Sequence, residues 1–168
     1  LTQRGRMAAA LAGVRLNTDF IDNSAGVDCS DHEVNIKILL GDVVEAGDLT
    51  VKQRDEMMVR MTDDVSALVL RDNTLQNLAL SMGQAIAPDL LDAQGRLMRI
   101  LESKGRLNRA LEHLPNDEAL AERRKAGQGL TRPEASVLLA NSKMALYAEL
   151  LETGLPDRQY FALDLAKY

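Results

Sequence analysis

The stretch TDDVSALVLRDNTLQNLALSMGQAI, residues 62–86, decides the fold class. Its apolar side chains recur at intervals of three and four residues, which is the period of an α-helix with one buried face. Thr62 suits the N-cap of such a helix, and Asp63 and Asp64 place negative charge at the positive end of the helix dipole. We therefore predict one long helix over this stretch.

Signals that start helices recur in the rest of the chain as pairs in which Ser or Thr is followed three residues later by Glu or Gln. These pairs are Ser30 with Glu33, Thr50 with Gln53, and Thr131 with Glu134. Only 3% of the 168 residues are aromatic, while 46% are hydrophobic, so the core must consist of aliphatic side chains, most of which favour helices. The prediction is an all-α fold, a multi-helix bundle. Residues 34–44 are apolar round most of the helix circumference, which predicts a helix buried on all sides.

The first thirty residues have a weaker helical pattern than the rest of the chain. Residues 15–21 mix apolar and polar side chains between two small-residue turns, which predicts a short strand, and residues 22–29 are predicted to form a loop. The chain is thus expected to open with a short helix over residues 2–11, which the strand and the loop of this leader follow. It begins with Leu1 rather than Met, and we interpret the sequence as a piece of a longer protein.

The bulk composition excludes several classes of function. A net charge of −5 offers no basic surface for nucleic acid, and no apolar run reaches the roughly 18–20 residues of a membrane span. The single cysteine, Cys29, cannot form an internal disulfide and suits the cytoplasm. No pair of His or Cys has metal-ligand spacing, so we expect no metal. The run from Arg123 to Lys125 is interpreted as a solvated helix face.

Chemistry is expected in one segment, DNSAGVDCSD at residues 22–31. Small and polar residues there lead into the helix predicted to start at Ser30, and a helix N-terminus binds carboxylates and phosphates. Gly26 would let the backbone approach a ligand closely. Taken from the residues alone, an ordinary loop with a helix cap remains the simpler interpretation.

A longer run, NTDFIDNSAGVDCSDHEVNIKI at residues 17–38, resembles the signature of the large bacterial NAD-specific glutamate dehydrogenases. Three later stretches resemble the C-terminal region of the same family: MTDDV at 61–65, LRDN at 70–73 and LTRPEASVLLA at 130–140. The smaller hexameric glutamate dehydrogenases share a related pattern, which falls here on residues 23–27, Ser30 and Glu33. Ala25 departs from it, since the pattern has Gly there, and so do Asp31 and His32, where the smaller enzymes have aromatic residues.

The resemblance implies roles for four residues. Asn23 and Gly26 would lie on the side of the cofactor NAD, and Val27 and Ser30 on the side of the substrate. Residues 1–30 would be the tail of the nucleotide-binding domain, and residues 31–168 the helical C-terminal domain. The activity implied for the full-length enzyme is oxidative deamination of L-glutamate to 2-oxoglutarate.

The family's catalytic lysine segment, its acidic proton carrier and its main dinucleotide motif do not occur in this sequence. We therefore expect no catalytic residue in the chain and no activity from the chain alone. The expected partners are the rest of the parent chain and further copies in a homo-oligomer. The alternative interpretation is a non-catalytic helical module for oligomerisation or regulation.

Overall fold

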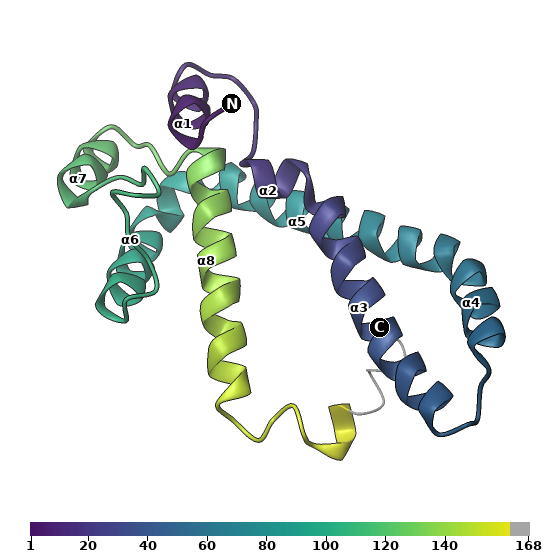
Figure 1. The fold of residues 1–168 in the computed structure, drawn as a ribbon. Helices are drawn as coiled ribbons and strands as arrows, with labels where there is room; N and C mark the ends of the chain where they lie inside the picture. Colours follow the sequence, from purple (N-terminus) through teal and green to yellow (C-terminus); the bar gives the residue numbers. More distant parts are fainter. Residues whose placement is uncertain (162–168) are drawn as a thin grey trace. The chain divides into compact units, whose positions relative to one another are not determined.

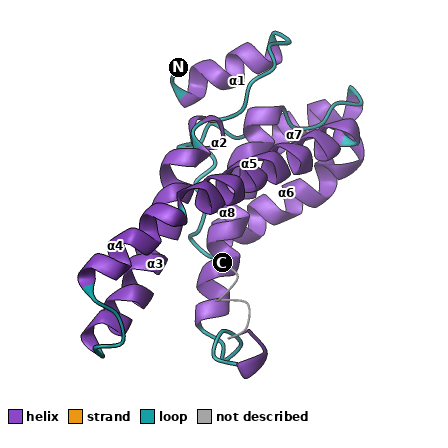
Figure 2. Ribbon diagram, turned by 90° about the vertical axis from the view of Figure 1, so that its right-hand side faces the viewer, coloured by secondary structure: helices purple, strands orange, loops and turns teal. Residues whose placement is uncertain are grey.

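The computed structural model describes residues 1–161, and it confirms the all-α prediction, since every regular element in that range is helical (Figures 1 and 2). In chain order the elements are α1 (Gln3–Leu11), α2 (Asp19–Asp22), α3 (Ser24–Glu45), α4 (Val51–Arg60), α5 (Thr62–Ala85), α6 (Ala87–Ser103), α7 (Asp117–Lys125) and α8 (Arg132–Leu151). None of the described helices is both long and apolar enough to span a membrane.

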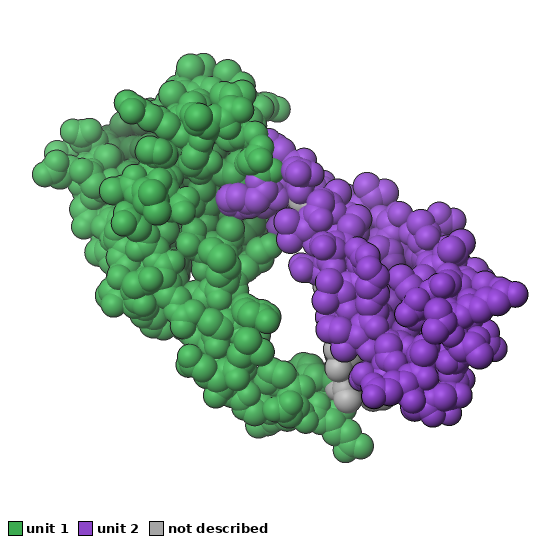
Figure 3. Space-filling view, viewed as in Figure 1, with its two compact units in different colours: residues 1–19, 78–168 green, residues 20–77 purple. Residues whose placement is uncertain are grey.

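The chain divides into two compact units, coloured separately in Figure 3. Unit 1 consists of Leu1–Asp19 and the chain from Leu78 onward, and unit 2 is Phe20–Asn77. The long helix α5 contributes its first part to unit 2 and its last part to unit 1. The two units are described separately below.

Unit 1 holds the larger core, in which α6 and α8 pack together while α7 covers α6 and α1 contacts α8. Its apolar core contains aliphatic and methionine side chains, as the composition requires: Met7, Leu91, Met98, Leu101, Leu107, Leu114, Leu120, Leu130, Val137, Leu138 and Ala145. Gly129 permits one close contact, because a Cβ atom there would overlap the backbone carbonyl of Ala87 at the start of α6. The connection between α7 and α8 can therefore lie against α6 only with glycine at this position.

Unit 2 has a much smaller apolar core. Helices α3 and α4 pack against each other, and the buried apolar side chains are those of Ile21, Leu40 and Val69. The capping box predicted for Thr50 and Gln53 is confirmed at the start of α4, where the Thr50 backbone N–H donates to Oε1 of Gln53 at 2.9 Å. Beside these apolar residues lies one buried titratable side chain, which is described with the candidate site.

The predicted strand at residues 15–21 is wrong. Residues 14–18 are irregular, and α2 begins at Asp19. A strand requires a neighbouring strand to complete its hydrogen bonds, and no strand occurs among residues 1–161. The Asn17 carbonyl instead accepts a hydrogen bond from Nη1 of Arg6 at 3.0 Å, and the Asn17 side-chain oxygen accepts one from Nε of Arg132 at 2.5 Å. Hydrogen bonds from two arginine side chains therefore fix this segment at Asn17, where a strand would have needed the hydrogen bonds of a sheet.

The predicted burial of residues 34–44 is also wrong. Helix α3 includes these residues, but Val34 is 50% exposed, and Ile38 and Leu39 are each 61% exposed. Unit 2 covers only one face of α3, the face that carries Leu40. The apolar circumference therefore remains open on the other side within the described residues, since unit 2 contains too few elements to enclose the helix.

Candidate functional site

The candidate residues lie at the start of α3, which begins six residues earlier than predicted. Residues 24–29 are helical rather than a loop, and Asn23 occupies the N-cap position. Asparagine is a favoured N-cap residue, so its residue type could have suggested an earlier start. The Asn23 side chain makes no capping hydrogen bond, however. Its amide is therefore not used for capping the helix.

The four residues assigned by resemblance share one face of α3. Asn23, Gly26, Val27 and Ser30 occupy positions i, i+3, i+4 and i+7, which lie on one side of an α-helix. All four residues are exposed, and Val27 is 63% exposed. We call this set the α3 face. The helical start of α3 thus brings together Ser30 and three residues that the sequence analysis had placed in a loop.

Gly26 is not required by the fold. Its backbone is ordinary helix, and a Cβ atom added there would meet only the Asn23 side chain, at 3.5 Å from Oδ1, which is normal van der Waals contact. Glycine within a helix is destabilising by roughly 0.5–1 kcal/mol relative to alanine. The absence of a side chain at Gly26 therefore has no explanation inside unit 2, and it leaves space above the α3 face.

Ser30 does not cap a helix, so the capping box predicted for Ser30 and Glu33 is wrong. Ser30 lies inside α3, and Glu33 forms an ion pair with Lys37 one turn further on. Gly26 did not stop the helix, because a single glycine costs only about 1 kcal/mol in a helix. The Ser30 hydroxyl is consequently exposed on the α3 face and is not at the helix N-terminus.

The opposite face of α3 carries a polar group that sequence reasoning missed. His32 is buried, with 1% of its surface exposed, and its Nε2 lies 4.0 Å from Oδ1 of Asp28, one turn earlier on α3. Asp72 of α5 joins them, and one ligand atom from each of the three residues lies within 4.8 Å of the others. Sequence spacing gave no sign of this cluster, because Asp72 comes from another helix.

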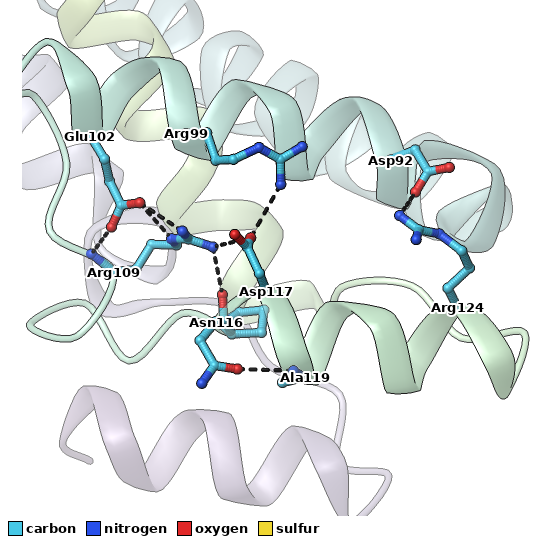
Figure 4. A network of polar contacts seen from close by, with 9 residues as sticks. Asp92, Arg99, Glu102, Arg109, Asn116, Asp117, Ala119 and Arg124 are labelled. Atoms are coloured by element: carbon cyan, nitrogen blue, oxygen red, sulfur yellow. Dashed lines mark hydrogen bonds and ion pairs between the residues drawn. The ribbon is translucent and has the colours of Figure 1, made fainter.

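A second polar network, in unit 1, connects α6 to the start of α7 (Figure 4). Arg109 donates through Nε to Oε2 of Glu102 at 2.8 Å and through Nη1 to Oδ1 of Asp117 at 2.9 Å. Arg99 donates to the same Asp117 oxygen at 3.1 Å. The hydrogen bonds from Arg109 are the main cause of a lowered pKa at Glu102 and at Asp117. The hydrogen bond to Glu102 in turn raises the pKa of Arg109. This network holds the turn between the two helices.

The basic run at residues 123–125 is not simply a solvated face. Arg123 is largely buried and donates two hydrogen bonds to Glu134 of α8, while Arg124 pairs with Asp92 of α6. Helix α7 is therefore tied by ion pairs to both helices beside it. These contacts explain why so polar a helix belongs to unit 1, and they give it a structural role.

Comparisons with known proteins identify the family. Residues 1–83 match the family described as bacterial NAD-glutamate dehydrogenase, catalytic domain, and residues 127–168 match glutamate dehydrogenase, C-terminal. The NAD-specific glutamate dehydrogenase of Pseudomonas aeruginosa is 55% identical over 98% of this chain, that of Halomonas elongata 52% over 94%, and that of Mycobacterium tuberculosis 45% over 100%.

The chain spans about 10% of the length of each of these relatives. Both ends of the chain match family models, and the relatives align with nearly all of it. The chain therefore belongs to the bacterial NAD-specific glutamate dehydrogenase family.

Proposed function

We propose that this chain is a segment of an NAD-dependent glutamate dehydrogenase and that the α3 face forms one edge of its active site. The full-length enzyme would oxidatively deaminate L-glutamate to 2-oxoglutarate. The observation that carries the proposal is the grouping of Asn23, Gly26, Val27 and Ser30 on a single exposed helix face. Residues that contact the substrate and the cofactor of one reaction must face the same active-site space, and these four residues share one side of α3.

Val27 and Ser30 would serve the substrate. The Ser30 hydroxyl is exposed and can donate a hydrogen bond to a glutamate carboxylate oxygen. Val27, 63% exposed and adjacent on the same face, offers an apolar surface for the methylene groups of glutamate. Together they would fix one end of the substrate and its carbon chain.

Asn23 and Gly26 would serve the cofactor side. When bound, NAD supplies the acceptor for the hydride that leaves glutamate. The residues fit an edge of such a site, since the Asn23 amide makes no capping bond and Gly26 leaves room above the helix. Asn23 would position the nicotinamide end through its amide, and Gly26 would let the cofactor approach the helix backbone.

The remaining machinery would come from other parts of the parent chain, so we expect the 168 residues alone to be inactive. We further propose that residues 1–30 belong to the nucleotide-binding domain, that residues 31–168 form the helical C-terminal domain, and that the parent is a cytoplasmic homo-oligomer. The exposed free thiol of Cys29 supports a reducing compartment.

The substitution Ser30→Ala in the full-length protein tests the substrate role. Because Ser30 is exposed inside a helix and caps nothing, alanine should leave the free energy of unfolding unchanged or raise it slightly. The KM for glutamate should rise by about tenfold, as expected for the loss of one hydrogen bond to a charged group. Steady-state kinetics and urea denaturation measure the two effects.

The matched control is Asn35→Ala, which removes another exposed polar side chain of α3 that lies away from the α3 face. Its KM for glutamate should equal that of the unmodified enzyme. An unchanged KM in Ser30→Ala would refute the substrate role of Ser30. Glutamate turnover by the purified 168-residue chain would refute the proposal that catalysis needs the rest of the parent.

A non-catalytic module for oligomerisation or regulation is the second candidate function. It is favoured by the second half of α8, where large apolar side chains are exposed: Met144 (59%), Leu146 (57%), Tyr147 (66%) and Leu151 (60%). Such a surface promotes association. A concentration-dependent dimer in sedimentation equilibrium, broken by Leu146→Lys in a full-length protein that keeps its activity, would support this role over the active-site role.

A further inference from the structure

The side of α3 opposite the α3 face carries a cluster of one histidine and two aspartates. Asp28 and His32 lie one turn apart on α3, and Asp72 comes from α5 within the same unit. We propose that these three side chains form a binding site for a divalent transition-metal ion of the zinc type, which would cross-link α3 and α5. This proposal goes beyond the proposed dehydrogenase role and does not depend on it.

The spacing of the ligand atoms suits one small cation. One atom from each of Asp28, His32 and Asp72 lies within 4.8 Å of the others, and Nε2 of His32 is 4.0 Å from Oδ1 of Asp28. Ligand atoms about 2.1 Å from a tetrahedral zinc ion are roughly 3.4 Å apart from one another. Small rotations of the carboxylate groups would bring the three atoms to that separation.

The identity and burial of the three groups point to a transition metal. Imidazole nitrogen with carboxylate oxygen is a typical ligand set for zinc, whereas Mg²⁺ and Ca²⁺ prefer oxygen alone. His32 is 1% exposed, so its ring is held in place, while the side chains of Asp28 and Asp72 are 19% and 31% exposed. An ion can therefore enter from the carboxylate side, with water as a fourth ligand.

The charges of the cluster also favour a cation. Asp28 and Asp72 bring two negative charges close to a buried imidazole. Arg71 is near as well, with its Nε 3.6 Å from Oδ1 of Asp72, but its side chain is 65% exposed and its pairing is correspondingly weak. The second oxygen of Asp72 remains available as a ligand. A bound divalent ion would offset the repulsion between the two carboxylates.

Unit 2 is small and buries few apolar side chains. It spans residues 20–77, and its buried apolar side chains are those of Ile21, Leu40 and Val69. A single hydrophobic core in a unit of fewer than about 70 residues supplies little stability, and natural small proteins often add disulfides or a structural metal. Cys29 is the only cysteine of the chain, so a disulfide within unit 2 is impossible. A metal between α3 and α5 would fix the helix that presents the α3 face.

The experiment uses the full 168-residue chain, treated with EDTA and dialysed. Isothermal titration calorimetry with zinc chloride should show one ion bound per chain. Saturating zinc should also raise Tm by several degrees, because an ion that binds only the folded state stabilises it. Absence of zinc binding by the folded chain would refute the proposal and would identify the cluster as a purely ionic contact.

Three conservative substitutions locate the site: Asp28→Asn, His32→Gln and Asp72→Asn. Each should weaken zinc binding by at least about tenfold, since even partners of metal ligands have effects of that size. The controls are Cys29→Ser, which removes the exposed thiol beside the cluster, and His113→Asn, which removes the other histidine. Both controls should bind zinc as the unmodified chain does.

Two results would overturn the assignment: unchanged zinc binding in the three variants, or lost binding in Cys29→Ser. If a variant does not give a helical circular-dichroism spectrum, the visible absorption of cobalt(II) added to the unmodified chain tests the site instead. Intense visible bands of tetrahedral cobalt without thiolate charge-transfer absorption support the site. Thiolate absorption, or the weak spectrum of hydrated cobalt, refutes it.

Discussion

Arg123 and Glu134 form a bidentate ion pair inside unit 1: Nη1 of Arg123 lies 2.6 Å from Oε2 of Glu134, and Nη2 lies 2.8 Å from Oε1. Only 3% of the Glu134 side chain is exposed. The same carboxylate accepts a hydrogen bond from the Thr131 backbone N–H at 2.7 Å, so it joins α7 to the start of α8. The glutamate half of the predicted Thr131 capping box therefore also anchors a neighbouring helix.

Arg123→Ala should lower the free energy of unfolding by about 3–5 kcal/mol, because it leaves a buried carboxylate without its partner. The adjacent Arg124→Ala is the matched control, since it breaks a pair with Asp92 in which both side chains are more than half exposed. That loss should be about 1 kcal/mol or less. Urea denaturation of the 168-residue chain measures both values, and equal losses would contradict the distinction between buried and exposed pairs.

Gly129→Ala should destabilise unit 1 by about 1–3 kcal/mol, the usual cost of overpacking, because the new Cβ would overlap the Ala87 backbone. Gly154→Ala serves as control, since a Cβ there meets nothing within 4 Å. Thermal unfolding followed by circular dichroism compares the two. A Tm for Gly129→Ala equal to that of the control would show that the connection before α8 can move away from α6.

Gly26→Ala should raise the free energy of unfolding by up to about 1 kcal/mol, since alanine favours the helix and the added methyl group meets only the Asn23 side chain. In the full-length protein the same change should raise the KM for NAD if the cofactor approaches Gly26. Gly41→Ala, also in α3 and in open space, should stabilise without altering the KM for NAD. An unaltered KM for NAD in Gly26→Ala would remove Gly26 from the cofactor side.

The stability of unit 1 should fall as the solution becomes acidic. Hydrogen bonds from Arg109 lower the pKa of Glu102 and the pKa of Asp117 in the folded chain (Figure 4). The unfolded chain therefore takes up protons first as the pH falls. The stability that these carboxylates add is complete above their ordinary pKa values, about 4.3 for Glu and 3.9 for Asp, and is lost as the pH falls through the lowered values.

Urea denaturation at a series of pH values from neutral to strongly acidic measures this dependence. Arg109→Gln should flatten the acid part of the curve, because the two carboxylates then titrate nearer their ordinary pKa values. Arg60→Gln, at an exposed position of α4, should leave the curve unchanged. An identical acid slope in Arg109→Gln and the unmodified chain would exclude this network as the source.

Local signals correctly predicted the starts of three helices. The Thr50 and Gln53 box begins α4, and the acidic first turn at Asp63 and Asp64 begins α5. The Thr131 and Glu134 box begins α8, where the Thr131 backbone N–H donates to Oε2 of Glu134 at 2.7 Å. These features depend on residues three or four positions apart, so the sequence contains all the information they need.

The errors arose where a distant partner decides the outcome. Residues 15–21 have the pattern of a strand but lack a neighbouring strand within the described chain, and Arg6 and Arg132 bind Asn17 instead. The start of α3 was misplaced because Ser30 and Glu33 match a capping pattern, whereas the helix already begins at Ser24 and includes both residues. The family, by contrast, was correctly identified from residues 17–38, because that signature is long.

The sequence by itself determined the helical fold class, the starts of three helices and, through the resemblance of residues 17–38, the family and the candidates Asn23, Gly26, Val27 and Ser30. Each of these depends on residue order along the chain. The tertiary structure alone decided that these four share an exposed helix face, and that Asp28 and His32 on the opposite face meet Asp72. The physical reason is that a helix presents different residues to its two sides, and only packing against other helices determines which side is covered.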